Sequence, residues 1–422
     1  MLVYSPHLSG NVYYQPHKKK PMTSLPLQHP GEPQRVTLVD ALRGFALMGL
    51  FLVHSCELFE LYWKNPVPSK VHDVIFFLFA GKAYAIFAML FGVSFFIIMD
   101  KQAQKGIDFR GRFLWRLILL FVMGTLNSMV YSGEVLQVLA VYGLILVFVY
   151  RIPNKWLMAG SIFFLLNLLL VYHCYAALHN FPGANDKPLS WVLYEPTGDM
   201  WVNGSLSQVL MFNLTSGSLA KWYFFFDGSR GFQLFGLFLA GLVLGRMGFF
   251  VRPLAFIRLR KNALIIAILG AIFFFAAQQY LAGPGKTLWP ESDMAKWYLG
   301  EWVDGYFCLA FMAILVLAFI AIYQKRLGQK VLGLLAPAGR MTLTLYVTQS
   351  LCGVPFFYGY GLDMWDKVSQ AQALAIGAVF FTLQVCFAHW WLKRFHYGPL
   401  EWVWRAGTYL TLDVPFRRAT AK

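Results

Sequence analysis

The sequence predicts an all-α, polytopic helical membrane protein with about ten transmembrane helices and both termini in the cytoplasm. Composition indicates the class, because 58% of the 422 residues are hydrophobic and only 13% are charged. A soluble domain has about 25% charged residues. Long apolar runs recur along the chain at the length that an α-helix needs to cross a lipid bilayer. The short alternating segments of a transmembrane barrel are absent from the sequence.

Ten apolar segments are the predicted spans. They cover residues 38–58, 74–99, 113–130, 135–150, 156–178, 232–248, 263–281, 302–323, 341–360 and 371–392. Residues 1–35 lack an apolar core and are predicted to be a disordered cytoplasmic tail. The chain then divides into a five-span bundle at 36–180, an external loop at 181–230 and a second five-span module with a cytoplasmic tail at 231–422. Within the loop, 206–226 is interpreted as an interfacial helix, with a further span as the alternative.

The distribution of charge supports this orientation. The net charge is +16, and most Lys and Arg residues lie in alternate short loops, as the positive-inside rule requires of cytoplasmic loops. This placement argues against a nucleic-acid partner. The five cysteines are scattered through apolar segments without metal-ligand spacing, so no metal site is predicted.

The first predicted span carries four polar side chains on one face. Asp40 and Arg43 lie near its start, and His54 and Glu57 lie near its end. At about 100° per residue, the four positions fall within a sector of roughly 100°. Arg43 and His54 are separated by roughly 16–17 Å along a helix axis. Because charges inside an apolar span are costly, this face is a candidate functional site.

Lys82 is a cation inside the second predicted span. It lies roughly 12 Å from the outer end of that span, where a lysine needs water or an anionic partner. Glu57 and Glu134 are the candidate partners. A structural ion pair between the first two spans is an alternative to a catalytic role for Lys82.

Several arginines are expected near the inner surface. Arg112, Arg116, Arg246 and Arg340 could join Arg43 in a basic pocket. A planar guanidinium bonds two phosphate oxygens at once, so such a pocket suits a phosphate-bearing ligand. The alternative for Arg43 is a snorkelling side chain that fixes the orientation of its span.

Several motifs in order resemble the YeiB family of bacterial membrane proteins. The first span matches the family's opening motif in Asp40-Ala41-Leu42-Arg43-Gly44, and the second matches in Gly81-Lys82-Ala83-Tyr84. Ser132-Gly133-Glu134 stands for a third motif, and the C-terminal module matches in the segments 339–346 and 397–405. The family is in turn similar, more distantly, to the transmembrane acyltransferases, which have an Arg, ten residues and then a His in their first span. Many YeiB proteins have Asn where this chain has His54.

The resemblance implies a protein of the bacterial plasma (inner) membrane and an acyltransferase activity. It implies a cytoplasmic acyl-CoA donor and an external acceptor, a glycan or a lipid-linked molecule. The implied catalytic residues are His54 as base, Glu57 as its orienting partner and Lys82 at the oxyanion. The implied donor-binding residues are Asp40, Arg43, Arg112, Arg116 and Arg340. The alternatives are a transporter or carrier of a small or lipid-linked substrate, and a non-enzymatic membrane subunit; the sequence does not indicate the oligomeric state.

Overall fold

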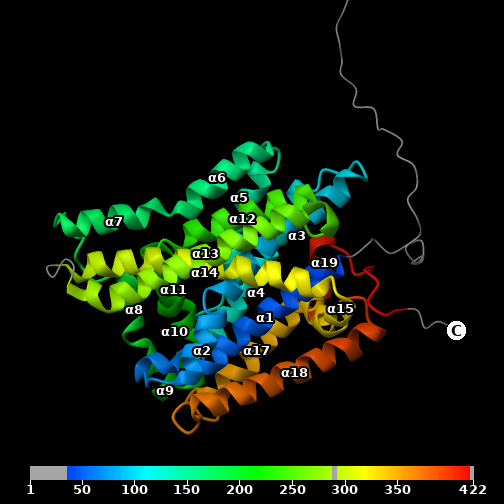
Figure 1. The fold of residues 1–422 in the computed structure, drawn as a ribbon. Coiled ribbons are helices and arrows are strands. Elements are labelled where there is room, and N and C mark those ends of the chain that lie inside the picture. Colours follow the sequence, from blue (N-terminus) through cyan, green and yellow to red (C-terminus); the bar gives the residue numbers. More distant parts are fainter. Residues whose placement is uncertain (1–35, 288–291, 419–422) are drawn as a thin grey trace, which may run out of the picture. The chain divides into compact units, whose positions relative to one another are not determined.

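The computed structural model describes residues 36–287 and 292–418, and in these ranges the chain is helical (Figure 1). The only extended pairing in the described part is an isolated antiparallel bridge between Phe395 and Arg417. The predicted tail at 1–35 lies outside the described residues. The N-terminal helices are α1 (Thr37–Cys56), α2 (Lys70–Phe79), α3 (Lys82–Ala103), α4 (Arg110–Val130), α5 (Leu136–Val149), α6 (Asn154–Leu166) and α7 (Leu168–Leu178).

Shorter helices follow before the C-terminal helices begin. They are α8 (Leu189–Tyr194), α9 (Thr197–Asn203), α10 (Leu206–Phe212), a π-helical turn (Asn213–Gly217) and α11 (Ser218–Asp227). The C-terminal helices are α12 (Arg230–Met247), α13 (Ile257–Ala282), α14 (Asp293–Tyr323), α15 (Arg326–Leu332), α16 (Ala336–Arg340), α17 (Thr342–Phe357), α18 (Gln370–Arg394) and α19 (Pro399–Tyr409). Short 3-10 turns lie at Leu61–Lys64, Pro253–Phe256, Pro284–Thr287 and Gly333–Leu335.

The helices of a polytopic membrane protein are present, but the count of ten spans is not confirmed. Seven helices of the described chain are long and apolar enough to cross a bilayer, or up to nine if each of two bent pairs is one span. In those pairs Leu206–Asp227 meets α12 at 74°, and Arg326–Arg340 meets α17 at 78°. The predicted fourth span is the short α5 of 14 residues. The orientation of the termini stays a prediction.

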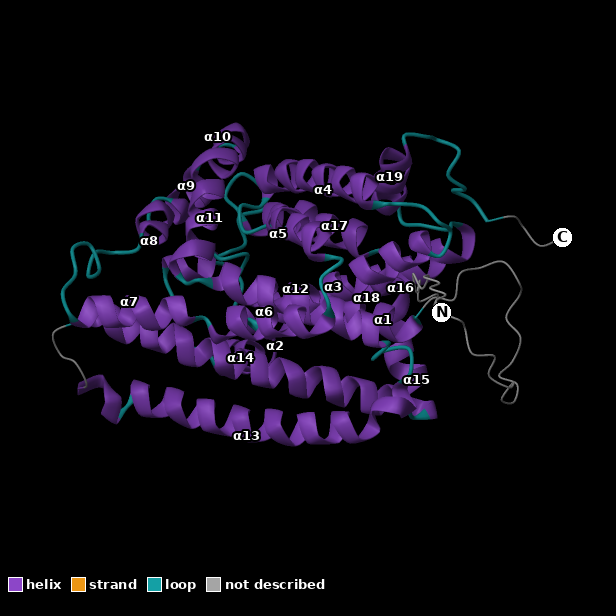
Figure 2. Cartoon of the chain, turned by 90° about the horizontal axis from the view of Figure 1, so that it is seen from above, coloured by secondary structure: helices purple, strands orange, loops and turns teal. Residues whose placement is uncertain are grey.

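Helix α1 lies near the middle of the described bundle in Figure 1. It contacts α2, α3, α14, α16, α17 and α18, and 67% of its most apolar window is buried, against 11% for α13. Helix α13 packs mainly on α14 at the edge of the bundle (Figure 2). A helix with apolar residues on most faces belongs inside the protein or against lipid. Helix α1 is the first case, and α13 is the second.

Glycines allow two helix crossings to be very close. A Cβ at Gly339 of α16 would lie 1.8 Å from the backbone oxygen of Asp40 in α1. In the second crossing, a Cβ at Gly92 of α3 would lie 2.2 Å from Phe238 O, and a Cβ at Gly241 of α12 would lie 2.0 Å from Met89 O. Small residues let membrane helices approach in this way. The crossings fix α1 and α3, which carry the polar side chains described below.

Candidate active site at the end of α1

The chain makes an unusual turn directly after α1. Leu58, Phe59 and Glu60 have φ angles of 54°, 47° and 74°, in the left-handed region that costs a non-glycine residue about 1–2 kcal/mol. Leu58 and Phe59 are buried, at 7% and 2% exposure, and this packing offsets the cost. The turn reverses the chain, so that Glu60 lies beside His54 of the preceding helix.

His54, Glu60 and Tyr131 form a hydrogen-bonded cluster. The Nδ1 atom of His54 lies 2.7 Å from Glu60 Oε1, and the Tyr131 hydroxyl donates to the same oxygen at 2.7 Å. The Tyr131 oxygen is also 3.0 Å from His54 Nδ1. All described contacts of the imidazole ring nitrogens therefore use Nδ1. Nε2 is left to exchange a proton with another molecule.

Glu57 lies beside this cluster but has a different partner. Its Oε1 accepts a hydrogen bond from the Trp63 indole N–H at 2.5 Å. We predicted that Glu57 would orient His54, and the structure gives that contact to Glu60. Ligand atoms of His54, Glu57 and Glu60 all lie within 4.8 Å of one another, close enough to hold a metal ion, although we predicted no metal site.

Tyr131 is held by the neighbouring helices. It follows α4 directly and is 2% exposed. Asn213, in the π-helical turn, donates from its amide to the backbone oxygens of Met129 and Val130, at 3.1 Å each. The Trp201 indole N–H in turn donates to Asn213 Oδ1 at 2.9 Å. These bonds fix the backbone that leads into Tyr131.

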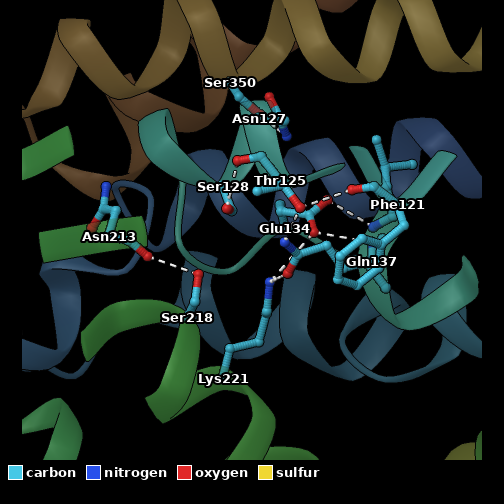
Figure 3. Close-up of polar contacts among 12 residues, drawn as sticks. Phe121, Thr125, Asn127, Ser128, Glu134, Gln137, Asn213, Ser218, Lys221 and Ser350 are labelled. Carbon is cyan, nitrogen blue, oxygen red and sulfur yellow. Dashed lines mark hydrogen bonds and ion pairs between the residues drawn. The ribbon is translucent and has the colours of Figure 1, made fainter. Parts of the chain in front are cut away.

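The same α4–α5 turn also carries one member of a buried ion pair, Glu134 with Lys221 (Figure 3). Lys221 Nζ lies 3.4 Å from Glu134 Oε1, with side chains 2% and 0% exposed, and 2.5 Å from Gln137 Oε1. The Glu134 carboxylate also accepts from the backbone N–H groups of Leu136 and Gln137 at 2.7 and 3.1 Å. Burial raises the pKa of Glu134, while the charge of Lys221 and these hydrogen bonds act against the rise. The pair joins the 206–227 segment to the turn that carries Tyr131.

Lys82 has other neighbours than the two glutamates considered from the sequence. It is 4% exposed, its Nζ donates to the backbone oxygen of Phe76 at 3.3 Å, and it lies 5.0 Å from the centre of the Phe307 ring. Glu134 pairs with Lys221 instead. No contact in the described part of the chain joins Lys82 to the His54 cluster.

Asp40 and Arg43 form the polar pair at the other end of the α1 face. The guanidinium of Arg43 bonds Asp40 Oδ1 at 2.7 Å and the Ser94 hydroxyl of α3 at 2.6 Å. Asp40 is 7% exposed. Arg340 donates to the backbone oxygen of His396 at 3.5 Å.

Arg112 and Arg116 lie on α4 against the C-terminal helix α19. Arg116 lies 3.5 Å from the centre of the Trp404 ring, and Arg112 lies 5.5 Å from that of Tyr409. No contact in the described part of the chain joins these arginines to Arg43 in one basic pocket.

Three residues of the site were not singled out from the sequence. They are Glu60, Tyr131 and Lys221. One signal was present, because Lys221 stands inside an apolar, aromatic segment, where a cation requires a partner. For Glu60 the sequence has no signal, because nothing in Leu58-Phe59 marks a left-handed turn.

Comparison with known families divides the chain into two parts. Residues 35–197 match the model described as heparan-alpha-glucosaminide N-acetyltransferase, catalytic, and residues 244–411 match that of a protein of unknown function (DUF418). The chain combines an acyltransferase-like N-terminal domain with a YeiB-type DUF418 domain. The predicted resemblance is thereby confirmed. The acyltransferase-like domain contains the whole His54–Glu60–Tyr131 cluster, and the DUF418 domain contributes α13 to α19.

Relatives of similar length exist in bacteria. The uncharacterized protein YxaH of Bacillus subtilis (strain 168) is 24% identical over 90% of this chain and 95% of its own length. An uncharacterized 39.9 kDa protein of Bacillus acidopullulyticus is 27% identical over 89% and 94%. The uncharacterized protein YeiB of Escherichia coli (strain K12) is 24% identical over 88% and 96%. The similarity therefore extends along both domains.

Proposed function

We propose that the protein is an integral membrane acyltransferase that moves an acyl group from cytoplasmic acyl-CoA to an external or lipid-linked acceptor, in the bacterial plasma membrane. The observation that carries the proposal is the 2.7 Å contact between His54 Nδ1 and Glu60. It lies within the segment that matches an N-acetyltransferase catalytic model. A carboxylate on Nδ1 fixes the tautomer whose Nε2 accepts a proton, as general-base catalysis requires.

The proposed reaction assigns one step to each group. His54 Nε2 takes the proton of an acceptor hydroxyl or amine while the acceptor atom attacks the thioester carbonyl carbon. A tetrahedral intermediate forms, its C–S bond breaks, and the CoA thiolate leaves and takes up the proton of the imidazolium, which returns His54 to its neutral form. Glu60 stabilises the imidazolium that forms, and the Tyr131 hydroxyl holds the Glu60 carboxylate in place.

The remaining predicted residues have roles that stay proposals. Lys82 would stabilise the oxyanion of the intermediate, since its ammonium has donors beyond the single bond to Phe76. Glu57, which lies beside His54, would contact the acceptor. Arg43, held by Asp40 on the same helix face, would direct the donor towards His54, roughly 16–17 Å away along α1. Arg340 would contact the donor at the inner surface.

The test is acyl transfer by the purified protein in lipid nanodiscs. Release of CoA from acetyl-CoA is measured with candidate amine and hydroxyl acceptors for wild type, His54→Ala and Glu60→Gln. His389→Gln is the matched control, because within the described residues the one hydrogen bond of that histidine is to the backbone of its own helix, at Val385 O. We expect both site variants to lose about 10²–10⁴-fold in rate and the control to retain it.

Two results separate this proposal from its alternatives. Wild type that neither binds acetyl-CoA nor releases CoA contradicts the acyltransferase. Uptake of an acceptor into proteoliposomes without CoA release supports a transporter or carrier, and replaceable His54 and Lys82 support a non-enzymatic subunit.

A further inference from the structure

Three arginines gather where α19 packs on the first turns of α4. The guanidinium carbons of Arg112 and Arg405 both lie near the Tyr409 ring, at 5.5 and 5.4 Å from its centre. Arg116 lies 3.5 Å from the centre of the Trp404 ring. The charge of Arg405 acts on Arg116, so the cations lie close together. One arginine comes from the DUF418 domain and two come from the acyltransferase-like domain.

None of the three guanidinium groups forms a hydrogen bond or an ion pair with any described residue. The carboxylate whose charge reaches Arg116 is that of Glu401. Glu401 is engaged elsewhere, because it accepts from the backbone N–H groups of Leu343 and Thr344 at 2.7 and 3.0 Å. Among the described residues, no carboxylate therefore forms an ion pair with these three guanidinium groups.

Stacking on aromatic rings leaves the arginines ready to bind an anion. When a guanidinium stacks on an aromatic ring, the flat face of the guanidinium contacts the ring. The five N–H donors of the guanidinium lie in its plane and point outward. Three adjacent cations repel one another, and an anion between them removes the repulsion. A phosphate group fits because its oxygens match the arginine fork. Arg112 is exposed and the other two are half-buried, so a ligand can reach the cluster.

The cluster lies at the opposite end of α4 from the candidate active site. Arg116 and Tyr131 are fifteen residues apart, which is roughly 22 Å along a helix, and the hydrocarbon layer is about 30 Å thick. A phosphate bound here would therefore lie near the face of the membrane opposite His54.

We propose that Arg112, Arg116 and Arg405 bind a phosphate ester at this face. The phosphate belongs either to the nucleotide part of coenzyme A or to an anionic lipid headgroup. Binding of coenzyme A rests on the proposed acyl transfer, whereas binding of a lipid headgroup does not. In both cases Arg405 makes the DUF418 domain part of a binding site shared with the acyltransferase-like domain.

The experiment measures binding rather than activity. Protein in phosphatidylcholine nanodiscs is titrated with coenzyme A by calorimetry, and phosphatidylglycerol that remains bound in detergent is measured by native mass spectrometry. Arg405→Gln and Arg116→Gln are compared with Arg394→Gln. Arg394 is the matched control, since it is an exposed arginine stacked on Trp390 at 4.6 Å. Arg405→Lys keeps the charge and checks that loss of binding is not loss of folding.

Each outcome decides between sources or overturns the site. Coenzyme A binding weakened about tenfold in Arg405→Gln, with Arg394→Gln unchanged, assigns the nucleotide. Phosphatidylglycerol lost from Arg405→Gln while coenzyme A binding is unaffected assigns the lipid. The affinity of Arg405→Lys should lie between those of wild type and Arg405→Gln, because a lysine ammonium keeps the charge but lacks the two parallel N–H donors of arginine. Equal binding of both probes to wild type and Arg405→Gln overturns the site. Absence of CoA release with retained phosphate binding overturns the proposed acyl transfer alone.

Discussion

Glu60 is the residue on which the candidate active site depends most. It reaches His54 through three consecutive left-handed residues that follow α1, and its Oε1 accepts from both His54 and Tyr131. Glu57 lies one helical turn from His54 but is bonded to Trp63. Because of the turn, the carboxylate of Glu60 contacts His54, whereas that of Glu57 contacts Trp63.

This difference predicts unequal effects of two matched substitutions. Glu60→Gln is expected to lower the rate of acyl transfer by about 10²-fold or more, because an amide cannot balance the imidazolium charge. Glu57→Gln should have the smaller effect, because its indole partner can still donate to the amide oxygen. Rates of CoA release for the two variants provide the measurement. A larger loss in Glu57→Gln would assign the orienting role to Glu57.

His54, Glu57 and Glu60 could act either as a general base with its carboxylate or as ligands of a metal ion, and removal of metal distinguishes the two. The short contact between His54 Nδ1 and Glu60 is a direct hydrogen bond, which a metal ion on Nδ1 would replace. We expect dialysis against a chelator to leave CoA release unchanged. Loss of activity that returns with added Zn²⁺ would show a metal centre instead.

At the scale of elements, segments beside the breaks between helices hold several of the polar contacts around the candidate active site. Asn213 and Lys221 lie in the 206–227 segment, which bends by 74° into α12, and both bond the chain around the α4–α5 turn. Helix α19 uses Glu401 to accept from the first backbone N–H groups of α17, where a carboxylate is favourable. Burial raises the pKa of Glu401, against these hydrogen bonds.

The buried Glu134–Lys221 pair predicts that removing one partner greatly lowers the stability of the fold. Lys221→Met leaves Glu134 buried without its cation and should cost about 3–5 kcal/mol in free energy of unfolding. Lys221→Met combined with Glu134→Gln should recover part of it, because no unpaired charge remains. Unfolding by detergent titration gives these values.

The pH dependence of the same variant checks the cause. Burial raises the pKa of Glu134 above its unfolded value, so the folded state binds more protons, and stability falls as pH rises. Without Lys221 the pKa of Glu134 should rise further, so the loss of stability should become larger and continue to higher pH. The same pH dependence in wild type and Lys221→Met would show that Glu134 does not carry the unpaired charge.

The crossing of α16 on α1 predicts the effect of a single methyl group. Gly339→Ala would place a Cβ 1.8 Å from Asp40 O, and relief requires the two helices to separate. We expect a lower melting temperature and a cost of at least about 1–3 kcal/mol. Gly111→Ala is the matched control, since nothing lies within 4 Å of a Cβ there. Equal melting temperatures for the two variants would contradict this crossing.

At the scale of the whole molecule, two domains enclose one central helix. Helix α1 belongs to the acyltransferase-like domain, yet it packs on α16, α17 and α18 of the DUF418 domain. The DUF418 domain therefore covers the helix that carries Arg43 and His54. It also carries Arg405, whose guanidinium lies over the Tyr409 ring of α19, the ring that Arg112 of α4 also contacts.

The orientation of the whole chain is open to a direct test. Both termini are predicted to be cytoplasmic, from the arginines of alternate loops. Green fluorescent protein fused at the C-terminus should fluoresce, and alkaline phosphatase inserted at Gly183, in the loop after α7, should be active. An active phosphatase fused at the C-terminus would reverse the orientation of the last helices.

The sequence by itself determined the features that depend on local patterns. Apolar runs of span length predicted α1, α3, α4, α13, α14 and α18, because a helix in lipid must bury its own backbone. The 3.6-residue period placed Asp40, Arg43 and His54 on one face of α1, and two of these are hydrogen-bonded as a pair. The number of spans was not determined in this way, because α5 is short and α12 and α17 each follow a sharp bend. The length of an apolar run does not show such a bend.

Only the tertiary structure decided which side chains meet. It paired Glu134 with Lys221, 87 residues away, and brought Tyr131 to Glu60, 71 residues away. It also chose Glu60 over Glu57 as the partner of His54, through a left-handed turn of residues that rarely adopt that conformation. The physical reason is the same in each case: a buried polar group takes whichever partner the packed helices bring within reach.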